Sequence, residues 1–195
     1  MSNNINNSVW KKIHLSEAVD YEQPNPYIVS SEILDSGKYP VLTPGKSFVK
    51  GYTDEEEGIY TEVPVIIFDD FTTASKYVDF DFKVKSSAMK ILKRKNEEVN
   101  IKYVFYQMQL IKINASTHKR YYLSKYQHLS FLFPFKDGSI DLEMQNKVVD
   151  EIESNFSVID KIEETISNSL KKTEQLRVSI LKKSFNKNLA DEEEK

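Results

Sequence analysis

The feature that most constrains the fold is a long stretch, residues 141 to about 184, that contains neither glycine nor proline. All five glycines and all six prolines of the chain precede it. Because these two residue types are the strongest helix breakers, the stretch predicts one continuous helix. At ~1.5 Å per residue, such a helix would be roughly 65 Å long. A rod of that length exceeds the width of a small domain.

An apolar stripe follows one side of the predicted helix. Isoleucines recur at seven-residue spacing, with the polar Thr173 in the same phase, and a second apolar row is interrupted by Asn155 and Ser169. This spacing is typical of coiled coils, and the apolar residues that widen the stripe favour a bundle or an antiparallel pair. The residues expected to mediate dimerisation are Val148, Ile152, Phe156, Ile159, Ile162, Ile166, Leu170, Leu176 and Ile180.

The length of the stripe predicts a partner. A helix this long cannot cover its apolar side with its own compact domain, so we expect it to pair, most simply with a second copy of the chain. The alternative is an extended helix that folds back over its own domain.

Residues 1–140 have the character of a mixed α/β domain. Strands are expected at 27–33, 48–52, 63–68, 77–84 and 129–135. In residues 77–84 the alternation of apolar and charged side chains is strict, which predicts one half-buried strand. Asn100 is a candidate N-cap, and the helical spacing of apolar residues from Ile101 to Ile111 predicts about three turns of buried helix. The expected fold class is α/β (α+β), a mixed-sheet domain followed by one long coiled-coil helix.

Composition excludes several classes of site. The chain has no cysteine, which rules out thiolate zinc sites, iron–sulfur clusters, a cysteine nucleophile and a disulfide scaffold. The polar N-terminus lacks the apolar run of a signal peptide, and no stretch approaches the ~20 apolar residues of a membrane span. We therefore expect a cytoplasmic protein that makes no contact with a membrane.

The charge is distributed unevenly along the chain. The net charge is -3, but residues 1–71 carry 5 Lys against 12 Asp and Glu, whereas residues 72–125 carry 12 Lys and Arg against 4 acidic residues. A basic central segment in an acidic protein indicates one positive surface that suits a phosphate backbone. The alternative is that folding mixes these charges into a neutral surface.

Two runs in the long helix resemble a known family. Residues 143–153 read EMQNKVVDEIE, and residues 176–185 read LRVSILKKSF. They resemble the central helix of the specificity subunits of type I restriction-modification systems, whose pattern is an E-Q-Q-like start, an I-V-x-x-I-E stretch and an L-R-x-S-I-L-x-x-A-F ending. Met144 stands for the usual first Gln, Ser184 for the usual Ala, and residues 186–188 for a Gly-containing exit.

The upstream sequence resembles one class of target-recognition domain in the same family. The sequence segments that carry this resemblance are YEQP at 21–24, PVLTPGKSFVKGYT at 40–53, PVIIFDDFTTA at 64–74 and KVKSSAMKIL at 83–92. Family members usually carry two recognition domains and two helices in tandem, whereas this chain carries one of each. The resemblance implies a recognition domain at 1–140, a helix for dimerisation and spacing at 141–185, and an acidic, disordered tail at 186–195.

The resemblance also implies a mechanism. Each recognition domain would read a few base pairs of double-stranded DNA, and two antiparallel helices in a homodimer would hold the two domains apart. An interrupted site with inverted symmetry follows. Catalysis would reside in a separate methyltransferase subunit and a motor-endonuclease subunit. No cofactor is expected here, neither S-adenosylmethionine nor ATP, because the glycines never fall in GxGxxG or GxxxxGK spacing.

Exposed loop residues that can reach phosphates or base edges are the candidates for DNA contact. They fall in a turn at 45–47, in two hydroxyl-rich connections around the alternating segment, and in a loop after the buried helix. They are Lys46, Ser47, Thr72, Thr73, Lys76, Tyr77, Lys85, Ser86, Ser87, Lys90, Ser116, Thr117, His118, Lys119, Arg120 and Tyr121. In the last loop, Arg120 suits bidentate contact with guanine and Lys119 suits phosphate. No metal-ligand spacing is found among the histidines.

Two other functions fit parts of the sequence. Asp70 (or Asp69), Asp81 and Lys83 mimic the carboxylate and lysine pattern of Mg²⁺-dependent nucleases. A chain whose coiled coil docks to another complex, and whose globular domain reads no sequence, is the second alternative.

Overall fold

The computed structural model describes residues 8–111 and 120–193. The chain divides into two units after Val149, a globular unit and a helical unit formed by residues 150–195. No helix in the described residues combines the length and the apolar character that crossing a bilayer requires.

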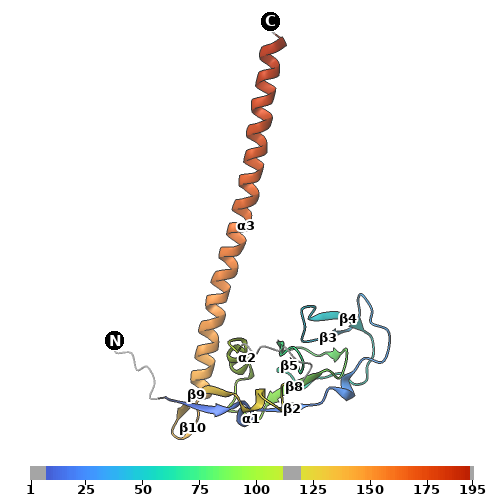
Figure 1. The fold of residues 1–195 in the computed structure, drawn as a ribbon, viewed down its shortest axis with the longest axis vertical. Coiled ribbons are helices and arrows are strands. Elements are labelled where there is room, and N and C mark those ends of the chain that lie inside the picture. The colour runs from blue at the N-terminus through green and yellow to red at the C-terminus, as the bar shows by residue number, and fades with distance from the viewer. Residues whose placement is uncertain (1–7, 112–119, 194–195) are drawn as a thin grey trace. The chain divides into compact units, whose positions relative to one another are not determined.

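The globular unit contains three small sheets within its described residues (Figure 1). The first, antiparallel, has the order β1 (Val9–His14), β9 (Ser130–Lys136) and β10 (Ser139–Ile140). The central sheet, also antiparallel, has the order β2 (Val19–Glu22), β8 (Met89–Arg94), β5 (Val65–Asp69) and β6 (Ser75–Val78). In the third, β3 (Tyr39–Leu42) lies between an antiparallel β4 (Val49–Thr53) and a parallel β7 (Lys83–Val84).

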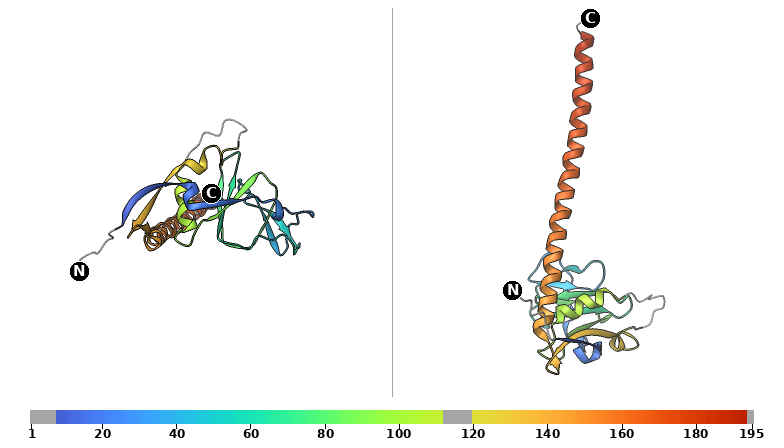
Figure 2. Two further views of the ribbon diagram at one scale, coloured as in Figure 1. Left: turned by 90° about the horizontal axis from the view of Figure 1, so that it is seen from below. Right: turned by 90° about the vertical axis from the view of Figure 1, so that its left-hand side faces the viewer.

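Short helices connect these sheets. They are α1 (Leu15–Ala18), the 3₁₀ turns η1 (Asn25–Tyr27) and η2 (Tyr126–His128), and α2 (Ile101–Gln109). The first sheet and the third lie at opposite ends of the unit, with the central sheet between them (Figures 1 and 2). This mixed-sheet unit, followed by a long helix, confirms the expected fold class.

Strand β5 is buried on both faces. Successive side chains of a strand alternate between faces, so Ile66 and Phe68 join one apolar cluster while Val65 and Ile67 join another. The first cluster also contains Val104 of α2. Two-sided burial explains why the sequence of β5 is a continuous apolar run rather than an alternating one.

The predicted buried helix is confirmed as α2, and Asn100 is its N-cap. The Asn100 side-chain oxygen accepts hydrogen bonds from the backbone N–H groups of Lys102 and Tyr103, at 2.8 and 3.1 Å. Its amide nitrogen donates to the side-chain oxygen of Asn146 at 2.7 Å. One side chain therefore caps α2 and connects it to the long helix.

We expect Asn100→Ala to lower the free energy of unfolding by about 1 kcal/mol, because two N–H groups at the start of α2 lose their acceptor. Urea denaturation measures the change. Asn100→Asp, which keeps the acceptor oxygen, is the matched control and should lose less. Equal losses in the two variants would contradict this role for the cap.

The long helix α3 (Leu142–Glu193) is confirmed and has 52 residues. Its start is fixed by Asp141, whose carboxylate accepts hydrogen bonds from Met144 N at 3.0 Å and from Ser8 Oγ at 2.7 Å. These bonds, the Ser8 bond first, lower the pKa of Asp141. The helix continues through residues 186–193, where we expected a disordered tail.

The first two turns of α3 belong to the globular unit. Gln145 is fully buried, and its side chain accepts from Asn100 N at 3.0 Å and donates to Glu98 O at 2.9 Å. Val149 is buried in the core, and Val148 packs against it. Val148, which we expected in the dimerisation stripe, therefore contacts its own unit.

Two of the strand predictions were wrong. Residues 27–33 begin in the 3₁₀ turn η1, where two prolines precede Tyr27, and Ile28 makes only an isolated bridge to Val84. Residues 77–84 are not one strand, because the chain leaves the central sheet after Val78 and joins β3 at Lys83. Val78, Phe82 and Val84 are buried as expected, but the change of sheet leaves Phe80 40% exposed and Lys83 only 3% exposed.

Candidate nucleic-acid interface

Two connecting loops leave the third sheet at the same edge. Strands β3 and β7 are parallel, with Leu42 paired to Val84, so the segments that follow them emerge side by side. The first is the turn at 43–48, which contains Lys46 and Ser47, and the second is the loop at 85–88. A hydrogen bond of 3.1 Å from Lys85 N to Leu42 O holds the two together.

The same loop adjoins the turn at the end of β5. Met89, the first residue of β8, pairs with Asp69, the last residue of β5. Asp70 N also donates to Ala88 O at 3.4 Å. The hydroxyl-rich turn at 69–74 therefore lies next to the loop at 85–88.

Asp70 attaches a fourth segment to this edge. Its backbone carbonyl accepts from Tyr121 N at 2.8 Å, and its carboxylate accepts from Tyr122 N at 2.8 Å. The carboxylate, in a residue only 4% exposed, lies 3.9 Å from Lys90 Nζ. Residues 120–122 are thereby fixed beside the turn. We call the segments 43–48, 69–74, 85–88 and 120–122 the loop edge.

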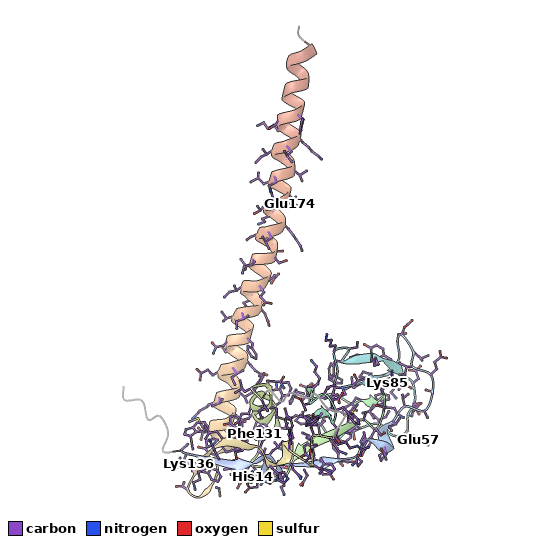
Figure 3. All side chains as sticks on the ribbon, in the orientation of Figure 1. His14, Glu57, Lys85, Phe131, Lys136 and Glu174 are labelled. Carbon is purple, nitrogen blue, oxygen red and sulfur yellow. The ribbon has the colours of Figure 1, made fainter. Side chains whose placement is uncertain are left out.

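The exposed groups of the loop edge suit a polyanion. Lys46, Lys85 and Arg120 supply exposed cations, and Figure 3 shows Lys85 near β3 and β4. The Asp69 carboxylate accepts two backbone N–H groups of its own turn, and the Asp70 carboxylate is buried. Both acids are thus engaged within the fold. The exposed hydroxyl groups belong to Ser47, Thr72, Ser86 and Ser87.

Lys90, predicted as an exposed loop residue, lies in the buried strand β8 and is 3% exposed. Its ammonium donates to the side-chain oxygen of Gln23 at 3.0 Å and lies 5.2 Å from the ring centroid of Tyr21. Burial lowers the pKa of Lys90, Arg120 lowers it further, and Asp70 opposes both effects. Lys90 therefore lies beneath the loop edge and contributes to its packing, not to its exposed surface.

Other predicted contact residues are also less exposed than expected. Tyr121 is buried, and Lys76 and Tyr77 are half-buried in β6. Thr73 is half-buried in the turn, where its side chain hydrogen-bonds with Tyr126. The expectation of exposure was wrong for Tyr121, and Thr73, Lys76 and Tyr77 are exposed only in part. Ser116, Thr117, His118 and Lys119 lie outside the described residues.

The residues of the nuclease alternative do not come together. Asp70 precedes β6 and is buried against Lys90, whereas Asp81 follows β6 and is exposed. Lys83 pairs with Glu55 and donates to Glu57 O at 2.8 Å, at a pocket of about 440 Å³ in another part of the unit. The hydrogen bond from Lys83 lowers the pKa of Glu55. Among the described residues, no cluster of three metal-binding side chains is present.

The helical unit carries its own candidate surface. Its apolar side chains at the predicted positions are 48 to 66% exposed, apart from Ile152, which is half-buried. The exposed ones are Phe156, Ile159, Ile162, Ile166, Leu170, Leu176 and Ile180. Single exposed apolar residues are ordinary, but a continuous row indicates a surface that another helix covers.

Sequence comparison identifies the family. The chain is 43% identical over 142 residues to the type I restriction enzyme EcoR124I/EcoR124II specificity subunit of Escherichia coli, an alignment that covers 69% of this chain and 35% of that protein. The chain belongs to the family of type I specificity subunits. The chain spans about a third of the length of that relative. No protein-family model matches the chain.

Solved structures agree with this family at the level of fold. The S subunit of a type I restriction-modification system from M. genitalium superposes with a TM-score of 0.50 at 16% identity, over 80% of this specificity subunit and 44% of that chain. A chain from a study of complex assembly and conformational transition in the type I R-M system gives 0.59 at 12% identity, over 89% and 46%.

Sequence reasoning missed the organising role of Asp70 in this specificity subunit. The sequence indicated Asp70 only as a possible metal ligand. The sequence signal that could have indicated this role is the segment Asp-Asp-Phe-Thr-Thr directly after a buried strand. Acidic and hydroxyl residues in that position are typical of a tight turn. The partner of that turn, residues 120–122, is about fifty positions away and has no local signal.

Proposed function

We propose that this specificity subunit reads one half of an interrupted site in double-stranded DNA through its loop edge. The observation that carries the proposal is the convergence of Lys46, Lys85 and Arg120 from three separate segments onto one edge of the unit. Cations of this kind bind phosphates, and hydroxyl groups and arginine can contact base edges. The two acids of the loop edge, Asp69 and Asp70, accept hydrogen bonds within the fold, and Asp70 is buried beside Lys90.

The exposed row on α3 supports the second part of the proposal. Two copies pair through antiparallel helices and hold two loop edges at a fixed separation, so that the site has inverted symmetry and an unread spacer. Methylation and cleavage reside in a methyltransferase subunit and a motor-endonuclease subunit that assemble with the dimer in the cytoplasm. The chain itself supplies recognition and geometry, without a cofactor.

Selection from a random duplex DNA library tests the proposal. The full chain, with the matching methyltransferase subunit present, should enrich two inverted half-sites separated by a constant gap. If no sequence is enriched, the proposal fails. If the chain also self-associates under those conditions, the interaction-only alternative gains support instead.

We expect Arg120→Ala to relax selectivity at one base position by about 1–3 kcal/mol, because a bidentate contact with guanine is lost. Lys85→Ala should instead weaken binding to all duplexes alike and reduce the salt dependence of affinity by about one phosphate contact. Fluorescence anisotropy at several salt concentrations separates the two effects. Lys136→Ala, an exposed lysine at the far end of β9, is the control, and an equal effect there would remove the loop edge from the interface.

A further inference from the structure

An aromatic side chain lies at the surface of the loop edge. Phe71 is 36% exposed and belongs to neither apolar cluster of the unit. It precedes the hydroxyl groups of Thr72 and Thr73 in the turn between β5 and β6. A single exposed phenylalanine is ordinary on a protein surface, so any role of Phe71 in binding has to be argued from the residues around it.

The turn that carries Phe71 is held in one conformation. The Asp69 carboxylate accepts from Phe71 N at 2.8 Å and from Thr72 N at 2.9 Å. Asp69 N donates to Ala74 O at 2.8 Å, and Thr73 N donates to Asp69 O at 3.0 Å. Thr73 has a φ of 62°, which a β-branched residue rarely adopts. A backbone conformation this costly persists only where the surroundings enforce it, and such positions cluster at binding sites.

The neighbours of the turn are polar and cationic. Asp70, next to Phe71, holds the backbone that follows Arg120, and it also contacts Ala88 at the end of the loop that begins with Lys85. A duplex that brings a guanine to Arg120 and a phosphate to Lys85 therefore brings a neighbouring base pair toward the turn next to them. Phe71 is the large apolar side chain of that turn.

From this placement we infer that Phe71 contacts the C5-methyl group of a thymine in the major groove and makes the site selective for that base. The inference rests on the proposed function. Thymine is the base that presents a methyl group there, and phenylalanine is among the side chains that recognise it. About two-thirds of the residue is covered, which favours contact with a methyl group in the groove over insertion between base pairs.

Replacing thymine with uracil in the selected site provides the test, because it removes the methyl group and preserves base pairing. For the unmodified chain, uracil at one position of each half-site should lower affinity about fourfold per contact, the factor for one buried methyl-sized group. Phe71→Ala should bind the thymine and uracil duplexes equally. Phe71→Leu, which keeps an apolar contact, should retain most of the preference.

Trp10→Ala is the matched control, because Trp10 is also an exposed aromatic residue, at 43%, but lies on β1 opposite Pro134. It should leave the thymine preference unchanged. A selected site without an invariant thymine, or a Phe71→Ala variant that still prefers thymine, overturns the inference and leaves the proposed function standing. Failure to select any sequence overturns the proposed function itself.

Discussion

The double substitution Ile159→Glu and Ile166→Glu is expected to abolish self-association of the chain. Both side chains are about half exposed on the helical unit and lie two turns apart in the same phase. In a symmetric pair each change occurs twice, so roughly 6 kcal/mol of apolar burial is lost, or about 10⁴-fold in the dimer Kd. Analytical ultracentrifugation of the full chain measures the effect.

The control for this variant places the same charges on the other side of the helix. Ser157 and Asn168 are exposed and lie roughly opposite Ile159 and Ile166, since each residue advances the helix by about 100°. Ser157→Glu with Asn168→Glu should leave the dimer intact. A dimer that survives the isoleucine changes, or dissociates with the control changes, would contradict pairing through this stripe.

Asp70→Ala is expected to destabilise the globular unit by roughly 3–5 kcal/mol, because it leaves the buried Lys90 without its anion. It also leaves the backbone N–H of Tyr122 without the acceptor that it has at 2.8 Å. Chemical denaturation measures the loss. Asp79→Ala, at an exposed position beyond β6, should cost less than about 0.5 kcal/mol.

The pH dependence of this variant provides an independent readout. Burial lowers the pKa of Lys90 from 10.5, and Asp70 opposes that shift, so the pKa should fall further when Asp70 is removed. Protons are then bound more tightly by the unfolded chain than by the folded one between the folded pKa and 10.5, and stability rises with pH in that window. The difference in unfolding free energy between the natural chain and Asp70→Ala should narrow as pH approaches 10.5. A constant difference would mean that the Asp70–Lys90 charge interaction contributes little.

The parts of the fold that the sequence predicted are those with strong local patterns. The long helix, the N-cap at Asn100 and strands β4, β5 and β9 each have a signal within a few residues. Strands β1 and β2 were missed because their exposed residues interrupt the apolar pattern. Strand β8 was missed because it contains Lys90, whose burial depends on an aspartate twenty positions away.

The candidate site could be predicted only as separate pieces. Lys46, Ser86 and Arg120 were each recognisable as polar loop residues, but their convergence depends on the parallel pairing of β3 with β7 and on Asp70. Lys83 was expected on an exposed face and is buried, because residues 77–84 change sheet and the alternation does not continue across the break. Local periodicity does not report which sheet a strand joins.

The row of apolar side chains on α3 makes the proposed assembly depend on the concentration of the chain. In the proposed dimer, pairing would bury that row, and the fraction of paired chains would rise with their concentration, so that dilute chains would keep it in contact with water. An unpaired helix that exposes apolar side chains would be a target for proteases and chaperones. Unpaired chains would thus be degraded while paired chains persist. The amount of the proposed DNA-reading dimer would then depend on how much of the chain the cell makes.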